Sequence, residues 1–255
     1  MHEFVVTGSS SGIGEAVAAR MRAQGRTVIG VAHDSGEVVA DLATDAGRTA
    51  AINRVLERGD GALDGAVCAA GLLSNTDMAR IVSVNFFGTL ACLDGWFDAL
   101  RRGSGAAATV LASTGAAQVP DAERHPLVRA LLEGDENRAR YEAVTAGHGL
   151  LVYCLSKFAL VCAMRERAAR WAAAGVRINA VAPGPIETPM LRTLERDETV
   201  PEAQRRFVPP LGRNGHPEEV AELIGYLHSP ASCFVHGTVI FIDGGVDAVT
   251  RPHRF

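Results

Sequence analysis

Residues 7–14 of the chain read Thr-Gly-Ser-Ser-Ser-Gly-Ile-Gly and follow directly after the apolar run Phe4-Val5-Val6. A phosphate-binding turn between a strand and a helix needs Gly8 for the sharp exit, Gly12 for close approach to a pyrophosphate, and Gly14 for tight packing. The first N–H groups of the following helix would then face the phosphates. The context predicts a dinucleotide site, and a Gly/Ser turn without a ligand is the alternative.

Short apolar runs alternate with longer helical patterns through most of the chain. Several runs are continuous Val, Ile and Ala, as expected for a parallel sheet that helices cover on both faces. The expected strands are residues 3–7, 27–32, 37–40, 64–69, 106–113, 176–182 and 237–242, and the expected helices are 12–24, 45–58, 76–101, 150–174 and 217–228. Gly25 stands where a C′ glycine would end the first helix. This order predicts a Rossmann-type α/β fold with a doubly wound parallel sheet of about seven strands, in a single domain over residues 1–255.

Two segments depart from the alternation. Residues 115–149 contain two prolines and Gly134, but also a mixed-charge helical stretch at 127–144. A structureless loop of this length is unusual in a compact domain, so we interpret the segment as a helical insertion. Residues 188–215, in which prolines bound a charged helix, are interpreted as a lid over the substrate.

Composition argues against several classes of protein. The 255 residues are 47% hydrophobic with a net charge of −4, and no block of Lys and Arg predicts nucleic-acid binding. The five cysteines include no Cys-x-x-Cys pair and the eight histidines no two-His helical spacing, so we expect reduced thiols and no metal site. No apolar run approaches the ~20 residues that span a bilayer, and Met1 leads to Phe4 without a signal sequence. We therefore expect a cytoplasmic protein that binds neither membrane nor nucleic acid.

Tyr153 and Lys157 form a second chemical pattern. They stand at i and i+4, on one face of the expected helix 150–174. An unperturbed tyrosine titrates near ~10. A neighbouring ammonium stabilises the phenolate and lowers its pKa, so Tyr153 could exchange a proton with an alcohol or ketone. A tyrosine and a lysine that merely share a helix face are the alternative.

Ser113 and Asn85 add to this pattern. Ser113 ends the expected strand 106–113, where its hydroxyl could hydrogen-bond a substrate oxygen beside Tyr153. Asn85 lies inside a long apolar helix, where a buried amide needs a reason. A serine that simply starts a loop and a structural asparagine are the ordinary alternatives.

These motifs resemble those of the short-chain dehydrogenase/reductase family. That family carries Thr-Gly-x-x-x-Gly-Ile-Gly after its first strand, and then Asn, Ser, Tyr and Lys in the order found here. Residues 179–184, Asn-Ala-Val-Ala-Pro-Gly, resemble its Asn-x-x-x-Pro-Gly, and Ile242-Asp243-Gly244-Gly245 resembles its final strand and turn. The resemblance covers essentially the whole chain, and it implies hydride transfer between NAD(P) and an alcohol or ketone.

The resemblance implies roles for the matching residues. The catalytic residues would be Asn85, Ser113, Tyr153 and Lys157, with a water on Asn85 linking to the lysine. The coenzyme would contact Gly8, Ser10, Ser11, Gly12, Ile13, Gly14, His33, Asp34, Asp41, Leu42, Ala70, Gly71, Tyr153, Lys157, Pro183, Gly184, Ile186 and Thr188. The substrate would contact Ser113, Tyr153, Met190 and Leu191, with Leu194 and Phe207 as further wall residues. Ordinary helix packing explains the apolar lid residues equally well, and a helix N-cap or turn acid is the alternative for Asp41.

Two departures from the family pattern leave the choice of coenzyme open. Cys68-Ala69-Ala70-Gly71 replaces the family's Asn-Asn-Ala-Gly, so an asparagine contact is lost while the glycine still permits close approach. The second strand ends in Ala32, where an acid would select NAD and a following Arg would accept the phosphate of NADP. Asp34 could replace the acid, or His33 could tolerate phosphate. Family resemblance slightly favours NAD.

Two further features narrow the resemblance within the family. The gap of 40 positions from Ser113 to Tyr153, and the end of the chain from Val235 to Pro252, look like the bacterial 3α-hydroxysteroid dehydrogenase/carbonyl reductases. This implies a hydrophobic secondary alcohol or ketone as substrate. A coniferyl-alcohol-type dehydrogenase is an alternative, and a non-catalytic dinucleotide-binding regulator is an alternative of another class. Because the insertion could cover helices that other members pair, we expect a homodimer through residues 217–245.

Overall fold

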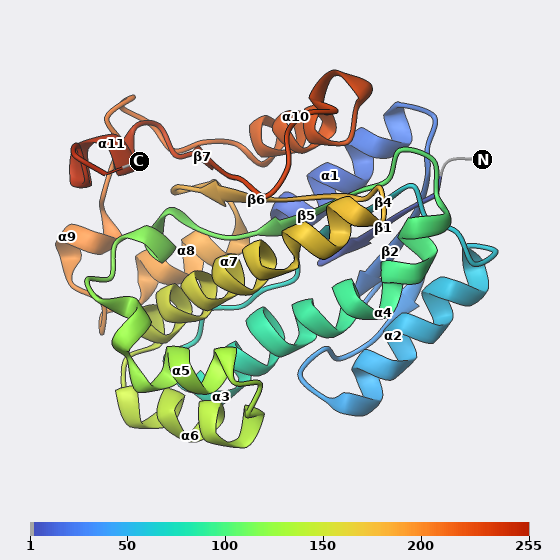
Figure 1. Ribbon diagram of the computed structural model, residues 1–255. Coiled ribbons are helices and arrows are strands. Elements are labelled where there is room, and N and C mark those ends of the chain that lie inside the picture. The colour runs from blue at the N-terminus through green and yellow to red at the C-terminus, as the bar shows by residue number, and fades with distance from the viewer. Residues whose placement is uncertain (1–2, 255) are drawn as a thin grey trace.

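Seven parallel strands form one sheet in the order β3-β2-β1-β4-β5-β6-β7, with helices on both faces (Figure 1). The computed structural model describes residues 3–254, apart from the side chain of Gln204. The strands are β1 Glu3–Thr7, β2 Thr27–Ala32, β3 Val38–Val39, β4 Gly65–Cys68, β5 Ala107–Leu111, β6 Arg177–Pro183 and β7 Val239–Ile242. The predicted doubly wound α/β fold is confirmed, and every strand boundary falls within two residues of its expected place.

The main helices form two layers around the sheet. One face carries α1 Gly12–Ala23 and α10 Pro217–Leu227. The other face carries α2 Asp45–Arg58, α4 Thr89–Arg102 and α7 Gly149–Ala173 (Figure 1). The strands are continuous apolar runs because they are covered on both sides. Among the helices of residues 3–254, none combines the length and the apolar character that crossing a membrane requires.

The expected helix 76–101 is helical from Met78 onward but contains an irregular turn. α3 Met78–Val82 begins after Asp77, whose carboxylate caps it. A π-helical turn, Ser83–Gly88, follows and leads into α4. Such turns are rare, occur mostly as single turns inside α-helices, and are frequent at functional sites. Asn85 lies within this one, so the prediction of a regular helix was wrong at these six residues.

The insertion 115–149 holds two helices where one was expected over 127–144. α5 Pro126–Leu132 and α6 Glu136–Ala146 are separated at Gly134, whose φ of +75° ends the first helix. Buried leucine, valine and alanine side chains of α5 and two buried alanines of α6 join the core that α7 shares with the sheet. The insertion is therefore part of the main hydrophobic core.

The segment predicted as a lid, 188–215, also contains two helices instead of one. They are α8 Pro189–Arg196 and α9 Glu202–Arg205. The N–H of Leu211 donates to the carbonyl of Gly244 at 3.1 Å, which ties the end of the lid to the turn after β7. The short helix α11 Val246–Thr250 follows that turn.

The centre of the sheet is the point where the strand order reverses. β1 and β4 pair side by side, and the chain continues from β1 to β2 on one side and from β4 to β5 on the other. Loops that leave adjacent strands in opposite directions open a crevice at their carboxyl ends, where doubly wound folds bind ligands. The glycine-rich turn after β1 and residues 69–71 after β4 lie at this crevice.

Candidate active site

The glycine-rich turn after β1 has the backbone of a phosphate cradle. Gly8 (φ +71°) and Gly12 (φ +55°) lie in the left-handed region, and a Cβ on Gly8 would stand 2.9 Å from the Cα of Ala70. A Cβ on Gly14 would overlap the carbonyl of Gly8, so α1 packs directly on the turn. Ser11, the N-cap of α1, makes no side-chain hydrogen bond to the helix. Its hydroxyl therefore leaves the N–H groups of the first helical turn available to a phosphate.

A cavity of about 660 Å³ extends from this turn to the catalytic candidates. The predicted site residues that line it are Gly8, Ser11, Gly12, Ile13, Gly14, Gly71, Ser113, Tyr153, Lys157, Pro183, Gly184, Ile186, Thr188, Met190 and Leu191. Those that do not line it are Ser10, His33, Asp34, Asp41, Leu42, Ala70 and Asn85. The structure thus brings the cradle, the Tyr-Lys pair and the lid to one space.

Tyr153 and Ser113 are in contact inside this cavity. Burial is the largest influence on Tyr153, and with the nearby thiol of Cys154 it raises the pKa of the phenol to about 12. A hydrogen bond with Ser113 acts in the opposite direction. The pKa of Tyr153 thus shifts in the opposite direction to the lowering that we expected from Lys157, because desolvation of the phenolate is the largest influence on it.

Lys157 is buried, with 3% of its surface exposed, on the same face of α7 as Tyr153. Its Nζ donates a hydrogen bond to the carbonyl of Leu111 at 2.6 Å and lies 5.7 Å from the centroid of the Tyr153 ring. Burial lowers the pKa of the amine to about 8. The amine therefore stays mostly protonated at neutral pH, but it releases its proton more readily than a surface lysine does.

Asn85 is fully buried, and both ends of its amide are bonded. Its Oδ1 accepts from the N–H of Leu72 at 2.8 Å, and its Nδ2 donates to the carbonyl of Leu72 at 3.0 Å. A Cβ on Gly71 would lie 3.4 Å from both the Asn85 Oδ1 and the Lys157 Nζ, so the glycine keeps the space between them open. The observed contacts are those of a structural asparagine, and the water-holding role stays a prediction.

Asn75 is a polar residue that the sequence analysis missed. Its Oδ1 accepts from the N–H of Gly149, at the start of α7, at 2.9 Å. Its Nδ2 donates to Asp197 and, at 3.0 Å, to Thr199, both in the lid. One amide thus joins the lid to the helix that carries Tyr153. Its three partners stand 74, 122 and 124 positions away along the chain, so no local sequence pattern could have indicated them.

The lid side of the cavity is mainly apolar. Met190, Leu191, Leu194 and Phe207 line it, and α11 adds the side chains of Val246 and Thr250. Thr188, predicted as a coenzyme contact, is also the N-cap of α8, where its hydroxyl accepts from the N–H of Leu191 at 3.3 Å. The placement favours the pocket-wall interpretation of the lid residues over simple packing.

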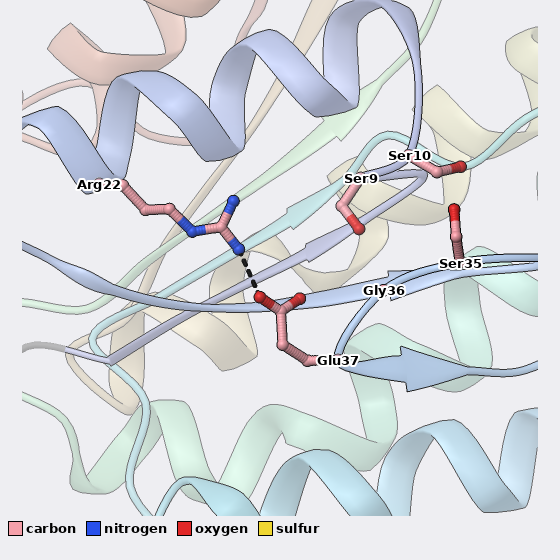
Figure 2. Close-up of a pocket in the computed structure, with 6 residues that line it drawn as sticks. All are labelled: Ser9, Ser10, Arg22, Ser35, Gly36 and Glu37. Atoms are coloured by element: carbon pink, nitrogen blue, oxygen red, sulfur yellow. Dashed lines mark hydrogen bonds and ion pairs between the residues drawn. The ribbon is translucent and has the colours of Figure 1, made fainter.

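A second hollow, of about 400 Å³, lies beside the end of β2 (Figure 2). Its lining, which we call the β2 corner, consists of Ser9, Ser10, Arg22, Ser35, Gly36 and Glu37. Arg22 and Glu37 form an ion pair at 2.6 Å (Figure 2). Glu37 also accepts from the N–H of Gly30 at 2.9 Å, which ties the corner to the middle of β2. Ser10 is therefore a residue of this corner and not of the main cavity.

Asp34 lies next to the β2 corner, two positions after Ala32, and its role toward a coenzyme stays a prediction. Its carboxylate is exposed, and hydrogen bonds with Ser10 and Ser35 lower its pKa. A lowered pKa keeps Asp34 charged at neutral pH. The loop after β2 therefore carries a negative charge against the glycine-rich turn.

Asp41 is held as a turn acid. It accepts from the N–H of Ala43 at 3.0 Å and pairs with Arg80 at 2.9 Å, while the exposed His33 lies 4.0 Å away. The N-cap of α2 is Thr44. The contacts of Asp41 are those of a turn acid and not of an N-cap, and its predicted contact with the coenzyme stays a prediction.

Comparisons with known proteins agree along the whole chain. A family profile described as short chain dehydrogenase matches residues 3–124, and one described as Enoyl-(Acyl carrier protein) reductase matches residues 137–247. The chain is 42% identical to a 3-alpha-hydroxysteroid dehydrogenase/carbonyl reductase of Comamonas testosteroni, over 100% of both proteins. It is 33% identical to a cis-4-hydroxycyclohexanecarboxylate dehydrogenase of Sinomonas cyclohexanicum, over 96% of each. The crystal structure of the 3-alpha-hydroxysteroid dehydrogenase from Pseudomonas sp. B-0831 complexed with NADH is similar, with a TM-score of 0.96 and 44% identity over 99% of this chain and 100% of that one.

Proposed function

The chain belongs to the short-chain dehydrogenase/reductase family of oxidoreductases, and we propose that it reversibly oxidises a secondary alcohol on a saturated ring, such as a 3α-hydroxysteroid, with NAD. The observation that carries the proposal is the cavity in which Ser113, Tyr153 and Lys157 meet the glycine-rich turn. Two relatives act on a 3α-hydroxysteroid and a 4-hydroxycyclohexanecarboxylate. Both of these substrates carry their hydroxyl on a six-membered saturated ring, which suits the apolar lid side of the cavity.

The residues around the cavity fit a nicotinamide dinucleotide. Gly8 and Gly12 allow backbone to approach a ligand closely, and the start of α1 offers N–H groups to a pyrophosphate. Pro183, Gly184 and Ile186 line the cavity and would bound the nicotinamide half. When bound, the coenzyme accepts a hydride from the alcohol carbon or donates one to the ketone.

Tyr153 is the proposed acid/base. In reduction its O–H donates a proton to the carbonyl oxygen, and in oxidation the phenolate takes the proton of the alcohol. The raised pKa of about 12 keeps the phenol protonated, which suits the acid role. The base role needs positive charge beside the phenolate, which the Lys157 ammonium provides. Ser113, already bonded to the phenol, would hold the substrate oxygen in line with it.

The charges around the β2 corner support NAD over NADP. Arg22 is already paired with Glu37, and Asp34 adds a further negative charge beside Ser10. Arg22 is the sole cation that lines this corner among the described residues. A 2′-phosphate would therefore meet carboxylates without a free guanidinium to bind it, whereas the serine hydroxyls and Asp34 suit a ribose hydroxyl.

A homodimer through residues 217–245 is the proposed assembly. β7 pairs with β6 on one side and lies at the edge of the sheet. Tyr226, on α10, is 45% exposed, and Phe234, between α10 and β7, is fully exposed. The insertion helices α5 and α6 meanwhile occupy the side of α7 that faces away from the sheet (Figure 1). We expect a dimeric mass by light scattering, and a tetrameric mass would overturn this assembly.

The reaction can be tested by following reduced nicotinamide in a matrix of coenzymes and alcohols. NAD and NADP would each be combined with a 3α-hydroxysteroid, cis-4-hydroxycyclohexanecarboxylate and coniferyl alcohol. We expect the highest kcat/KM with NAD and the steroid. Coniferyl alcohol as the best substrate would replace the ring-alcohol proposal, and the absence of turnover with every pair would leave a dinucleotide-binding protein without this chemistry.

A further inference from the structure

Arg48, on α2, is a buried guanidinium that meets three separate parts of the chain. Its Nε donates to the carbonyl of Leu42 at 2.8 Å, and its Nη2 donates to the carbonyl of Ser83 at 3.0 Å. Its two Nη groups also bond the carboxylate of Glu136 at 2.6 and 2.7 Å. A bidentate guanidinium–carboxylate pair has a fixed planar geometry, so Glu136 fixes the direction of the other donors.

The two carbonyls that Arg48 holds belong to parts of the proposed site. Leu42 follows Asp41 in the turn that the family resemblance places beside the adenine ring. Ser83 is the first residue of the π-turn that carries Asn85. The two parts also touch, because a Cβ on Gly88 would lie 2.9 Å from the Leu42 carbonyl oxygen. Arg48 therefore joins the turn at residues 41–43 to the π-turn that contains Asn85.

Glu136 comes from the insertion, at the start of α6. Its side chain is 24% exposed and that of Arg48 is 8% exposed, so this pair is largely shielded from water. Although burial opposes it, the guanidinium of Arg48 lowers the pKa of Glu136, and the carboxylate stays charged. Removal of one partner of a buried pair leaves an uncompensated charge. Without Glu136, Arg48 would be drawn toward Asp45, the exposed carboxylate 3.1 Å from it.

We propose that Glu136 and Arg48 are positioning residues, through which the insertion sets the place of Asn85 and of the turn at residues 41–43. A π-turn is less regular than an α-helix, and an external donor on its first carbonyl favours it over a regular turn. The proposal rests on the proposed function, in which Lys157 acts beside Tyr153, because Asn85 holds the backbone of Leu72 after β4 and the family resemblance links it to Lys157 through a water. It gives the insertion a role in the reaction in addition to its place in the core.

The test compares Glu136→Gln with Glu133→Gln in the full-length enzyme. Glu133 lies in the same insertion and pairs with Arg138 at 2.6 Å, but its side chain is 58% exposed. We expect Glu136→Gln to lower kcat and to raise the Kd for NADH, each by about tenfold, with the KM of the alcohol little changed. Glu133→Gln should match the parent. Parent-like values for Glu136→Gln would overturn the proposal.

A double-mutant cycle separates positioning from simple destabilisation. If Glu136 acts through Asn85, Glu136→Gln should lower kcat about tenfold in the parent but hardly at all in Asn85→Ala. An equal loss in both backgrounds would overturn the proposal. If Glu136→Gln folds poorly, Arg48→Lys takes its place in the cycle, because lysine keeps the positive charge but cannot make the bidentate bond. We expect Arg48→Lys to lower kcat in the parent and hardly at all in Asn85→Ala. If the parent turns over no alcohol, the proposed function fails. The Kd for NADH of the same variants still shows whether Glu136 and Arg48 set the position of the turn at residues 41–43.

Discussion

The catalytic end of the cavity and the β2 corner differ in the solvent exposure of their ionisable side chains. At the catalytic end, burial dominates, raising the pKa of Tyr153 to about 12 and lowering that of Lys157 to about 8. At the β2 corner the groups are exposed or half-exposed, and pairing dominates, as in the bond between Arg22 and Glu37. Desolvation changes proton affinity by several pKa units, whereas exposed pairs are screened. We therefore expect large effects on rate at the first end and graded effects on coenzyme choice at the second.

The largest effect is expected for Tyr153→Phe. The substitution removes the proton that moves in the reaction and keeps the ring, so turnover should fall by about 10²–10⁴-fold. Binding of NADH, followed by its fluorescence, should stay near the parent value because the glycine-rich turn is untouched. Activity near the parent level would contradict the assignment of Tyr153 as the acid/base. It would also contradict the difference in expected effects between the catalytic end and the β2 corner.

Lys157→Met should lower activity about a hundredfold and yet stabilise the fold. The folded pKa of about 8 lies below the ordinary 10.5, so the unfolded chain binds the extra proton between these pH values. The penalty for burying the charge is therefore complete below pH 8 and disappears as the pH rises to 10.5. The penalty for burying the Lys157 charge amounts to about 3 kcal/mol, and the lost hydrogen bond to Leu111 offsets about 1 kcal/mol of it. Urea unfolding at pH 7 should therefore show that the free energy of unfolding of the variant is about 2 kcal/mol higher than that of the parent. A variant less stable than the parent at pH 7 would contradict the dominance of burial at this end.

Asn75→Ala should act on the substrate side alone. Its amide joins the lid to the start of α7, so its removal loosens the apolar wall but leaves the glycine-rich turn and the β2 corner in place. We expect the KM of the alcohol to rise about fivefold with an unchanged Kd for NADH. Thr76→Ala, at an exposed neighbouring position, is the control. A parallel rise in the coenzyme Kd would show that the lid serves both halves of the cavity.

Glu37→Gln is expected to have the smallest effect, on coenzyme choice. The substitution frees the Arg22 guanidinium while keeping an acceptor for the N–H of Gly30. The ratio of kcat/KM for NADP to that for NAD should rise about threefold to fivefold, because both side chains are more than 40% exposed. The control is Glu222→Gln, which breaks the ion pair between Glu222 of α10 and Arg20, a residue on α1 like Arg22. It should leave the coenzyme ratio unchanged. A hundredfold switch would mean that this corner is shielded from solvent in the working enzyme.

Much of the fold could be predicted because its signals are local. Continuous apolar runs place the strands, and the glycines at positions 8 and 25 stand where positive φ is required. The i, i+4 spacing of Tyr153 and Lys157 likewise needs only a helix to bring both side chains to one face. The shared cavity follows from that spacing and from the rule that ligands bind at the carboxyl ends of parallel strands.

The sequence-based predictions were wrong where contacts between residues distant in the chain, or burial, determine the structure or the pKa. The sequence predicts a regular helix at the π-turn Ser83–Gly88, since the residues that its members bond, Leu72 and Arg48, lie outside this segment of the chain. The rise in the pKa of Tyr153 had the opposite direction to the expected one. Residue spacing shows which charge is near, but it does not show how much water is excluded.

The sequence by itself determined the doubly wound sheet, the glycine-rich cradle and the Tyr-Lys pair, because each depends on residues that are neighbours along the chain. Only the tertiary structure decided that Asn75 joins the lid to α7, that Glu37 occupies Arg22, and that Glu136 reaches Arg48 from 88 positions away. Hydrogen bonds and ion pairs act over a few ångströms in space, whatever the separation in sequence. Their partners are therefore known only once packing has brought them together.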